Sequence, residues 1–156
     1  MVGWGYNNKG QATAMPGKNF TAIAAGRVQS AALRDDGGIQ LWGTTGWAYT
    51  GGGLYVFFGR SPETKDFIAL GVGNTHGMGL RADGSVELWG YINSFPPTTK
   101  GFVAIAVGGE HDLALTADGS IVGWSRNDYG QATPPASSGF IAIAAGREHS
   151  VAIKGE

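Results

Sequence analysis

Apolar residues recur along this chain in short alternating runs that are separated by glycines. In residues 102–107, both alternating faces of the run Phe-Val-Ala-Ile-Ala-Val are apolar, which predicts a β-strand covered on two sides. A Gly-Gly pair ends this run, and a second alternating run follows at residues 113–116. Asp-Gly at 118–119 predicts a hairpin turn, because glycine adopts a positive φ at little cost. A third strand is expected at residues 121–124.

This three-strand unit occurs four times. Three copies open with a Phe and close with a Trp 22 positions later, whereas the fourth copy lacks its Trp. The opening residues are Phe20, Phe67, Phe102 and Phe140, and the closing residues are Trp42, Trp89 and Trp124. No segment shows helical apolar spacing over a helical length. Repeats of about 39 residues with two apolar faces predict an all-β protein whose units are antiparallel blades of a β-propeller. The connector after each third strand is expected to add a weaker outer strand.

The first residues of the chain match the end of a repeat. Val-Gly-Trp at 2–4 corresponds to Val-Gly-Trp at 122–124, and residues 6–13 correspond to residues 126–133. The chain therefore reads as four circularly permuted repeats, with 1–156 forming a single propeller domain. We expect the N-terminal strand to complete the last blade, because a paired strand leaves no open sheet edge.

Two ring sizes are compatible with this pattern. The four repeats could close alone, or two chains could form an eight-bladed homodimer in which residues 1–17 of one chain complete the last blade of the other. The homodimer is favoured, because such an interface is isologous and closes on itself. A fragment of a longer propeller is less favoured, because the two halves of the split repeat match.

Composition narrows the class of protein. The 28 glycines recur at fixed repeat positions, which indicates turns rather than disorder. A net charge of −1 does not favour nucleic acid or an anionic membrane as a partner. The absence of cysteine excludes disulfides and thiolate metal sites. Neither a membrane span nor a signal peptide is visible in the sequence, so a cytoplasmic location is expected by default.

The G-x-x-H, A-L, D-G and W-G positions resemble the regulator of chromosome condensation repeat family. Residues 146–153 (GREHSVAI) and 117–124 (ADGSIVGW) carry the pattern, and the resemblance covers nearly the whole chain except residues 44–66. The short repeat and its Gly-Gln-Ala-Thr connector are similar to the compact bacterial branch, which includes a propeller-type β-lactamase inhibitor protein. The resemblance implies the fold and a binding scaffold, since a fold does not fix a function.

In the inhibitor-like branch, aromatic residues are frequent just after the Ala-Gly of each repeat. The corresponding positions here are polar and hold no aromatic residue. They read Arg27-Val28-Gln29, Asn74-Thr75-His76, Gly109-Glu110-His111 and Arg147-Glu148-His149. Inhibition of a β-lactamase is therefore not expected.

Two sets of repeated residues have a functional and a structural interpretation. The histidines His76, His111 and His149 could form a metal ring, but successive blades are farther apart than one ion can bridge. Hydrogen bonds to loop backbone within each blade are the favoured interpretation. The repeat tryptophans, including Trp4, could stack on a sugar, but their fixed position favours packing between blades, with each indole N–H bonded to a backbone carbonyl.

Arg27 and Arg147 occupy the same repeat position and would lie on neighbouring blades of a closed ring. Two guanidinium groups on one face could hold a phosphate or a carboxylate. Alternatively, Glu110 and Glu148 on the equivalent loops could pair with them.

The connector at residues 44–66 departs most from the repeat. It spans 25 positions from Trp to Phe, against 16, 13 and 16 elsewhere. It carries five aromatic residues around a Gly-Gly-Gly segment, and such segments often form binding surfaces. The candidate contact residues are Trp47, Tyr49, Tyr55, Phe57, Phe58 and Arg60, to which the loop residues Arg27, Arg147, Glu110 and His76 are added. The alternative is an extra hairpin, Tyr49 to Gly59, that packs on its own blade or at a subunit contact.

The sequence contains no recognised catalytic motif, and no cofactor or metal is expected. It predicts a non-enzymatic scaffold that presents the aromatic connector and the polar loops to a macromolecule. A second hypothesis is a binder of a sugar, a nucleotide or another anionic metabolite, using the aromatics with Arg27 and Arg147. A third is a minimal or engineered propeller without a ligand, although the irregular connectors differ from an idealised design.

Overall fold

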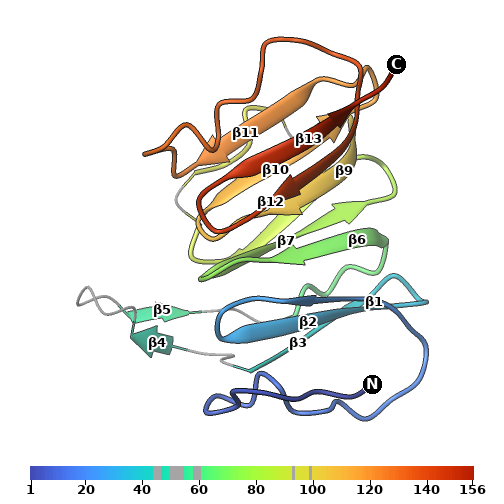
Figure 1. Cartoon of the computed structure of the whole chain (residues 1–156). Helices are drawn as coiled ribbons and strands as arrows, with labels where there is room; N and C mark the ends of the chain where they lie inside the picture. Colours follow the sequence, from blue (N-terminus) through green and yellow to red (C-terminus); the bar gives the residue numbers. More distant parts are fainter. Residues whose placement is uncertain (44–46, 50–54, 58–60, 93, 99) are drawn as a thin grey trace.

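The computed structural model describes residues 1–43, 47–49, 55–57, 61–92, 94–98 and 100–156. These residues form strands, turns and loops, and no helix is found among them. Small antiparallel sheets are stacked one on another in chain order, with the N-terminus at one end of the stack and the C-terminus at the other (Figure 1). The architecture is therefore all-β and of the propeller type.

Each repeat forms one sheet, which we call a blade. The strands are β1 (Phe20–Ala25), β2 (Gln29–Arg34), β3 (Ile39–Gly43), β4 (Trp47–Tyr49), β5 (Tyr55–Phe57), β6 (Phe67–Val72), β7 (His76–Arg81), β8 (Val86–Gly90), β9 (Phe102–Val107), β10 (His111–Thr116), β11 (Ile121–Ser125), β12 (Phe140–Ala145) and β13 (Ser150–Lys154). Blade 1 is β1-β2-β3, blade 2 is β6-β7-β8, blade 3 is β9-β10-β11 and blade 4 is β12-β13, while β4 and β5 pair separately. The three predicted strands are confirmed for each of the three complete units.

The Asp-Gly turns join blades as well as strands. Gly37, Gly84 and Gly119 have φ angles of 75°, 79° and 78°, so the predicted glycine turns are confirmed. The carbonyl of each turn glycine accepts a hydrogen bond from the amide of the Phe that opens the next blade, at 2.9–3.1 Å. This hydrogen bond recurs at all three boundaries between blades, so it sets the register of one blade against the next.

The first strand of each blade contains a bulge at its second residue. In blade 3, Phe102 pairs with Thr116 and Ala104 pairs with Leu115, so Val103 has no partner across the ladder. The equivalent residues Ile68 and Ile141 are, like Val103, more than half exposed. The prediction of a strand buried on both faces is wrong at this position, because a bulge turns its extra residue out of the ladder.

The core lies between blades. Trp89 of blade 2 packs in one cluster with Leu33 and Leu41 of blade 1, and Trp124 of blade 3 packs in another with Met78 and Leu80 of blade 2. The predicted packing of these tryptophans between blades is confirmed. The Trp42 Nε1–H donates to the Gln11 carbonyl at 3.0 Å, whereas the Trp89 Nε1–H donates to the Gln29 side chain at 3.3 Å. Trp124 Nε1 is buried and has no acceptor within the described part of the chain.

Two expectations about the connectors are corrected. The described connectors form turns and bends rather than an outer strand. Residues 1–5 also form no strand, and they lie against blade 1 at the far end of the stack from β13 (Figure 1). Within one chain the N-terminal strand therefore does not complete the last blade. The assignment of residues 1–156 to a single domain stays a prediction.

Candidate functional site

The loops between the first and second strands line up along one edge of the stack. We call residues 26–28, 73–75, 108–110 and 146–149 the loop rim. Backbone hydrogen bonds join it from blade to blade: Arg27 N donates to Gly73 O at 3.4 Å, Asn74 N to Gly109 O at 2.9 Å, and Gly109 N to Gly146 O at 3.3 Å. Equivalent loop positions of four blades are therefore held next to one another, as their equal place in the repeat requires.

Three polar side chains of the loop rim line one pocket. Arg27, Asn74 and Arg147 enclose about 320 Å³ at the edge where blades 1, 2 and 4 approach one another. Gly109 of blade 3 occupies the same repeat position and carries no side chain. A Cβ at Gly109 would lie 3.1 Å from both Arg147 Cγ and Asn74 Nδ2, so glycine there allows these two side chains to come together.

The pocket has more positive than negative charge. Arg147 Nε lies 3.7 Å from Glu148 Oε1, and its side chain is largely exposed, so this ion pair is weak. Glu110 does not pair with either rim arginine; its carboxylate instead accepts from Arg126 at 3.0 Å. Arg27 makes no ion pair within the described residues. The sequence-based pairing of Glu110 and Glu148 with the rim arginines thus holds for Glu148 alone.

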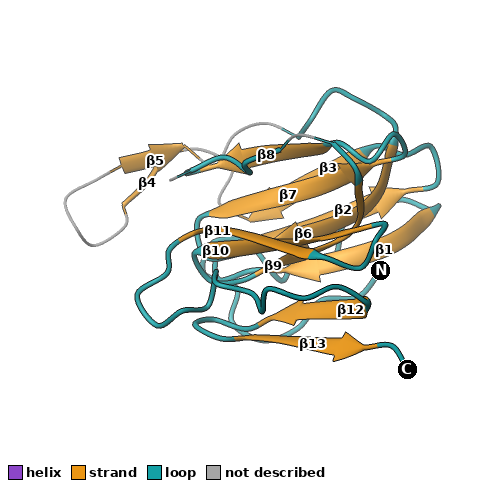
Figure 2. Cartoon of the chain, turned by 90° about the horizontal axis from the view of Figure 1, so that it is seen from above, coloured by secondary structure: helices purple, strands orange, loops and turns teal. Residues whose placement is uncertain are grey.

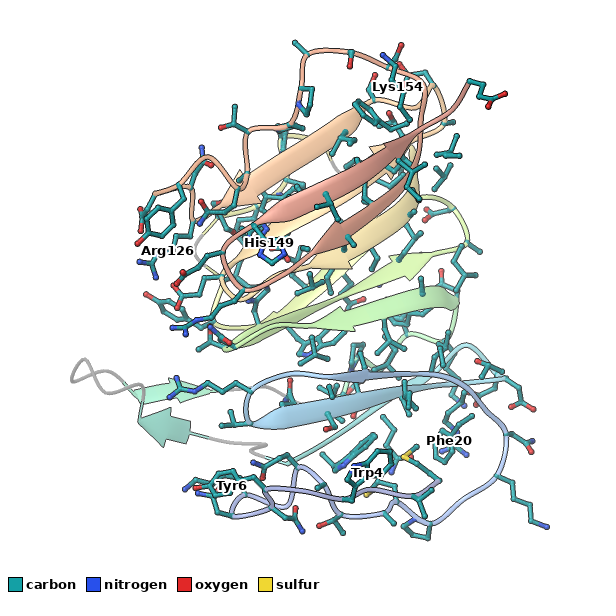
Figure 3. The ribbon with its side chains drawn as sticks, in the orientation of Figure 1. Trp4, Tyr6, Phe20, Arg126, His149 and Lys154 are labelled. Atoms are coloured by element: carbon teal, nitrogen blue, oxygen red, sulfur yellow. The ribbon has the colours of Figure 1, made fainter. Side chains whose placement is uncertain are left out.

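Arg126 is held in a separate acidic environment. Its Nε donates to the Asp128 carboxylate at 2.6 Å, and that bond, followed by the one to Glu110, raises the pKa of the Arg126 guanidinium. The positive charge of Arg126, which Figure 3 labels, is therefore already balanced by these two carboxylates. Arg27 and Arg147 are the rim cations with charge left for a ligand.

Two of the repeat histidines, His76 and His111, connect neighbouring blades. His76 Nε2 lies 2.9 Å from Asp112 Oδ1 of blade 3, and His111 Nε2 lies 2.9 Å from Ser150 Oγ of blade 4. The favoured interpretation, that these histidines make structural hydrogen bonds, is correct for His76 and His111. The expected partner was loop backbone of the same blade, and that part is wrong, because both partners are side chains of the next blade. His76 is only 5% exposed, so it cannot contribute to a binding surface. Burial lowers the pKa of His111, which favours its neutral form.

The aromatic connector forms a two-stranded hairpin. Trp47 pairs with Phe57 and Tyr49 with Tyr55 across β4 and β5, and the hairpin extends away from the stacked blades (Figures 1 and 2). The hairpin expected as the alternative is thus present in the backbone. Phe58 and Arg60 lie outside the described residues, so their expected roles stay predictions.

The structure adds Asn74 and Gly109 to the candidate site. Aligning the repeats places both at the position of Arg27 and Arg147. The alignment alone could have identified Asn74 as a site residue. The role of Gly109 could not be predicted in this way, because it depends on how closely the loops approach one another. Among the described residues, no three His, Cys, Asp or Glu side chains cluster as metal ligands.

Comparison with known proteins supports the repeat and the fold. Residues 102–131 match the Regulator of chromosome condensation (RCC1) repeat. No curated protein matches the sequence. The fold is similar to Prp20p from Saccharomyces cerevisiae (TM-score 0.70, 16% identity, covering 96% of this chain and 50% of that one). It is also similar to the CRINKLY WD40 ectodomain of the Arabidopsis thaliana receptor kinase ACR4 (0.69, 23%, 97% and 51%) and to human WBSCR16 (0.67, 18%, 88% and 45%).

The chain spans about half the length of these solved structures. At such low identity the similarity establishes the fold alone. The described part of the chain contains no helix of the length and apolar character that a membrane crossing requires.

Proposed function

We propose that this chain, which is built of regulator of chromosome condensation-like repeats in a β-propeller fold, is a non-enzymatic scaffold that binds a protein through its loop rim. The observation that carries the proposal is the alignment of four equivalent loops, bonded blade to blade, with Arg27 and Arg147 in one pocket. Backbone bonds hold these loops in place before a partner arrives, which lowers the entropic cost of binding.

The charge of the rim favours an acidic segment as the bound part of the partner. The chain as a whole carries a charge of −1, so a positive rim is a local feature rather than a consequence of composition. Among the proteins of similar fold, Prp20p, the yeast RCC1, is described by its binding to Gsp1p and histones and by a complex with Kap60. This protein supports protein binding as the kind of activity, and the partner of this chain is to be identified by experiment.

The β4-β5 hairpin is proposed as the second contact of the scaffold. It stands away from the blades in the backbone trace and carries Trp47 and Tyr55. Aromatic side chains supply contact area at low entropic cost. A partner that spans the rim and the hairpin would use both the cations and the aromatics that the sequence singles out.

Quantitative affinity capture with matched variants tests the scaffold. The wild-type chain, Arg27→Gln/Arg147→Gln, Trp47→Ala/Tyr55→Ala and the control Arg34→Gln are used as baits. We expect one set of proteins to be recovered equally by wild type and by the control, and several-fold less by the two site variants. Equal recovery by all four baits would reject the rim and the hairpin as binding sites.

A small anionic ligand is the second candidate function, and the pocket of Arg27, Asn74 and Arg147 favours it. Arginine donates in a fork that matches phosphate and carboxylate oxygens. Thermal stabilisation by inorganic phosphate, AMP or citrate that Arg147→Gln abolishes would support this candidate. Stabilisation that Arg34→Gln abolishes equally would reject it, because the effect would then be unspecific.

The working scaffold is further proposed to contain two copies of the chain. The support is that both ends of the stack expose apolar surface, including Trp4 and Val151. The expected cytoplasmic location and the similarity to the compact bacterial branch stay predictions.

A further inference from the structure

Blade 4 lacks the third strand that the three preceding blades have. Its strands β12 and β13 pair with each other, and the outer edge of β13 has no strand partner within the described residues. The side chains of Val151 and Ile153 on β13 are each 60% exposed. The corresponding residues of blade 3, Leu113 and Leu115, are buried. A strand edge with apolar neighbours is a template for pairing with another strand.

The N-terminal segment already has the local structure of the missing part. The residue after each closing Trp has a positive φ in blades 1–3, and Gly5, after Trp4, has the same conformation with φ 95°. A Cβ on Gly3 would collide with the Ala12 carbonyl, just as one on Gly123 would collide with the Ala132 carbonyl. Residues 2–12 are therefore folded like residues 122–132, although they pair with no sheet.

The contacts of this segment with blade 1 also repeat those between blades 3 and 4. Ser30 Oγ donates to the Gln11 carbonyl at 2.8 Å, and Ser150 Oγ donates to the Gln131 carbonyl at 2.8 Å. Inside the segments, Ala12 N donates to Asn7 Oδ1 and Ala132 N to Asn127 Oδ1, both at 2.8 Å. The N-terminal segment thus sits on blade 1 as the third strand and connector of a preceding blade would.

Beside the N-terminal segment is an open groove, at the place where the first two strands of a preceding blade would lie. A groove of about 400 Å³ lies between Val2 to Tyr6 on one side and Ile23 to Arg27 on the other. Its walls include Trp4, which is 85% exposed, and Ile23 of β1. In the interior of the stack, the equivalent space is filled by the first two strands of the preceding blade.

We propose that strands β12 and β13 of a second copy of this chain fill the groove, so that residues 2–4 of one copy become the third strand of blade 4 of the other. This inference rests on the proposed two-chain scaffold and assigns its interface. In blade 3, Trp124 pairs with Asp112 and Val122 with Ala114. The same register opposes Trp4 to Ser150 and Val2 to Ala152 of the second copy.

The histidine pattern agrees with this placement. Each buried histidine bonds to a residue of the next blade. That residue comes directly after the position that the histidine occupies in its own repeat: His76 bonds to Asp112, and His111 bonds to Ser150. His149 of blade 4 is exposed at the end of the stack (Figure 3). In the proposed interface its partner is Ser30 of the second copy, whose hydroxyl hydrogen is already donated to Gln11 and whose oxygen can accept.

A second copy is the occupant because one chain cannot place both halves together. The N-terminal segment lies below blade 1 and β13 lies beyond blade 4, with blades 2 and 3 between them (Figure 1). Two copies related by a twofold axis meet at two identical interfaces, and every blade then has three strands. Such a ring closes on itself and leaves no blade without its third strand.

The mass in solution is the first test. Native mass spectrometry and light scattering of the wild-type chain should give twice the 16.1 kDa mass of one copy. Val151→Lys/Ile153→Lys places two charges on side chains that are exposed in one copy, so it should give a folded monomer with an unchanged circular dichroism spectrum. A monomeric wild type, or a dimer that this variant leaves intact, would overturn the proposal.

The register is tested by cross-linking, which is straightforward because the chain has no cysteine. A Val2→Cys chain mixed with an Ala152→Cys chain should form a disulfide-linked pair under mild oxidation. The control mixture of Val2→Cys with Val151→Cys is one residue out of register, and its side chains lie on opposite faces of the sheet. Equal yields from the two mixtures would refute the strand pairing.

The interface and the binding function are tested separately. Trp47→Ala/Tyr55→Ala changes the hairpin and not the groove, so it should lose partner recovery while its mass remains that of two copies. If the wild type is monomeric but this hairpin variant still loses recovery, the two-copy interface fails and the binding scaffold stands. If the dimer forms and recovery is unaffected, the interface stands and the hairpin fails as a binding site.

Discussion

His76 in β7 and Asp112 in β10 form a buried contact across the boundary of blades 2 and 3, with 2.9 Å between His76 Nε2 and Asp112 Oδ1. Both side chains are almost fully buried, at 6% and 1% exposure. The contact places a buried polar pair at the same blade boundary as the apolar cluster of Met78, Leu80 and Trp124. The pair fixes how blade 2 is oriented against blade 3, because the two buried polar side chains can form their hydrogen bond in only one register of the two blades.

Removal of Asp112 should destabilise the stack. Asp112→Ala leaves His76 buried without its partner, and we expect a loss of about 1–3 kcal/mol in the free energy of unfolding. Urea denaturation measures it. Asp128→Ala is the matched control, because Asp128 pairs with Arg126 at the surface and its loss should cost less. Equal midpoints for the two variants would show that the buried contact contributes nothing.

Stability should fall as the pH falls through the range where histidine titrates. Burial lowers the folded-state pKa of His111, while in the unfolded chain the imidazole keeps its ordinary pKa of about 6.5. Below about pH 6.5 the unfolded state therefore binds more protons than the folded state. The contribution of His111 to folding stability is fully present above that pH and is lost as the pH falls to the lowered folded-state pKa. His76, Asp112 and His149 also act electrostatically on this group.

The thermal midpoint measured between pH 5 and pH 8 tests this dependence. His111→Gln removes the titrating group, and we expect a flatter midpoint against pH than in the wild type. A variant with the same acid-side slope as the wild type would assign the slope to other groups.

Ser125→Gly should stabilise the chain. Ser125 has a φ of 69° after Trp124, whereas the residues at the same place in the other repeats are glycines. A non-glycine residue in this region of φ costs about 1–2 kcal/mol of stability, which the glycine recovers. The gain is reduced by the lost contacts of the Ser125 hydroxyl, including that with Ser94. Calorimetry should show a higher thermal midpoint. Ser137→Gly, at a loop position without a positive φ, should show no such gain.

Gly77→Ala should destabilise blade 2. A Cβ at Gly77 would collide with the indole ring of Trp89, which packs over this glycine and donates to Gln29. Overpacking of this kind costs about 1–3 kcal/mol.

A double-mutant cycle with Trp89→Phe checks the cause. The smaller ring leaves space for the new methyl group, so Gly77→Ala should cost less in the Trp89→Phe background than alone. Strict additivity of the two changes would place the cost of Gly77→Ala elsewhere.

The sequence by itself determined the repeat, the three strands of each unit, the Asp-Gly turns and the packing of Trp89 and Trp124 between blades. These features depend on contacts that are repeated in every unit, so the periodic pattern carries them. It also placed Arg27 and Arg147 at one equivalent position, because equal places in a repeat become neighbouring places in a stack.

The tertiary structure decided the features that differ between units or depend on close approach. The bulge at Val103, the cross-blade partners of His76 and His111, and the open side of Gly109 follow from how one blade meets the next, which no local pattern records. The N-terminal segment gives the clearest case. Its sequence identifies it as part of a blade, but the distance between the ends of the stack decides that β13 of the same chain is out of its reach.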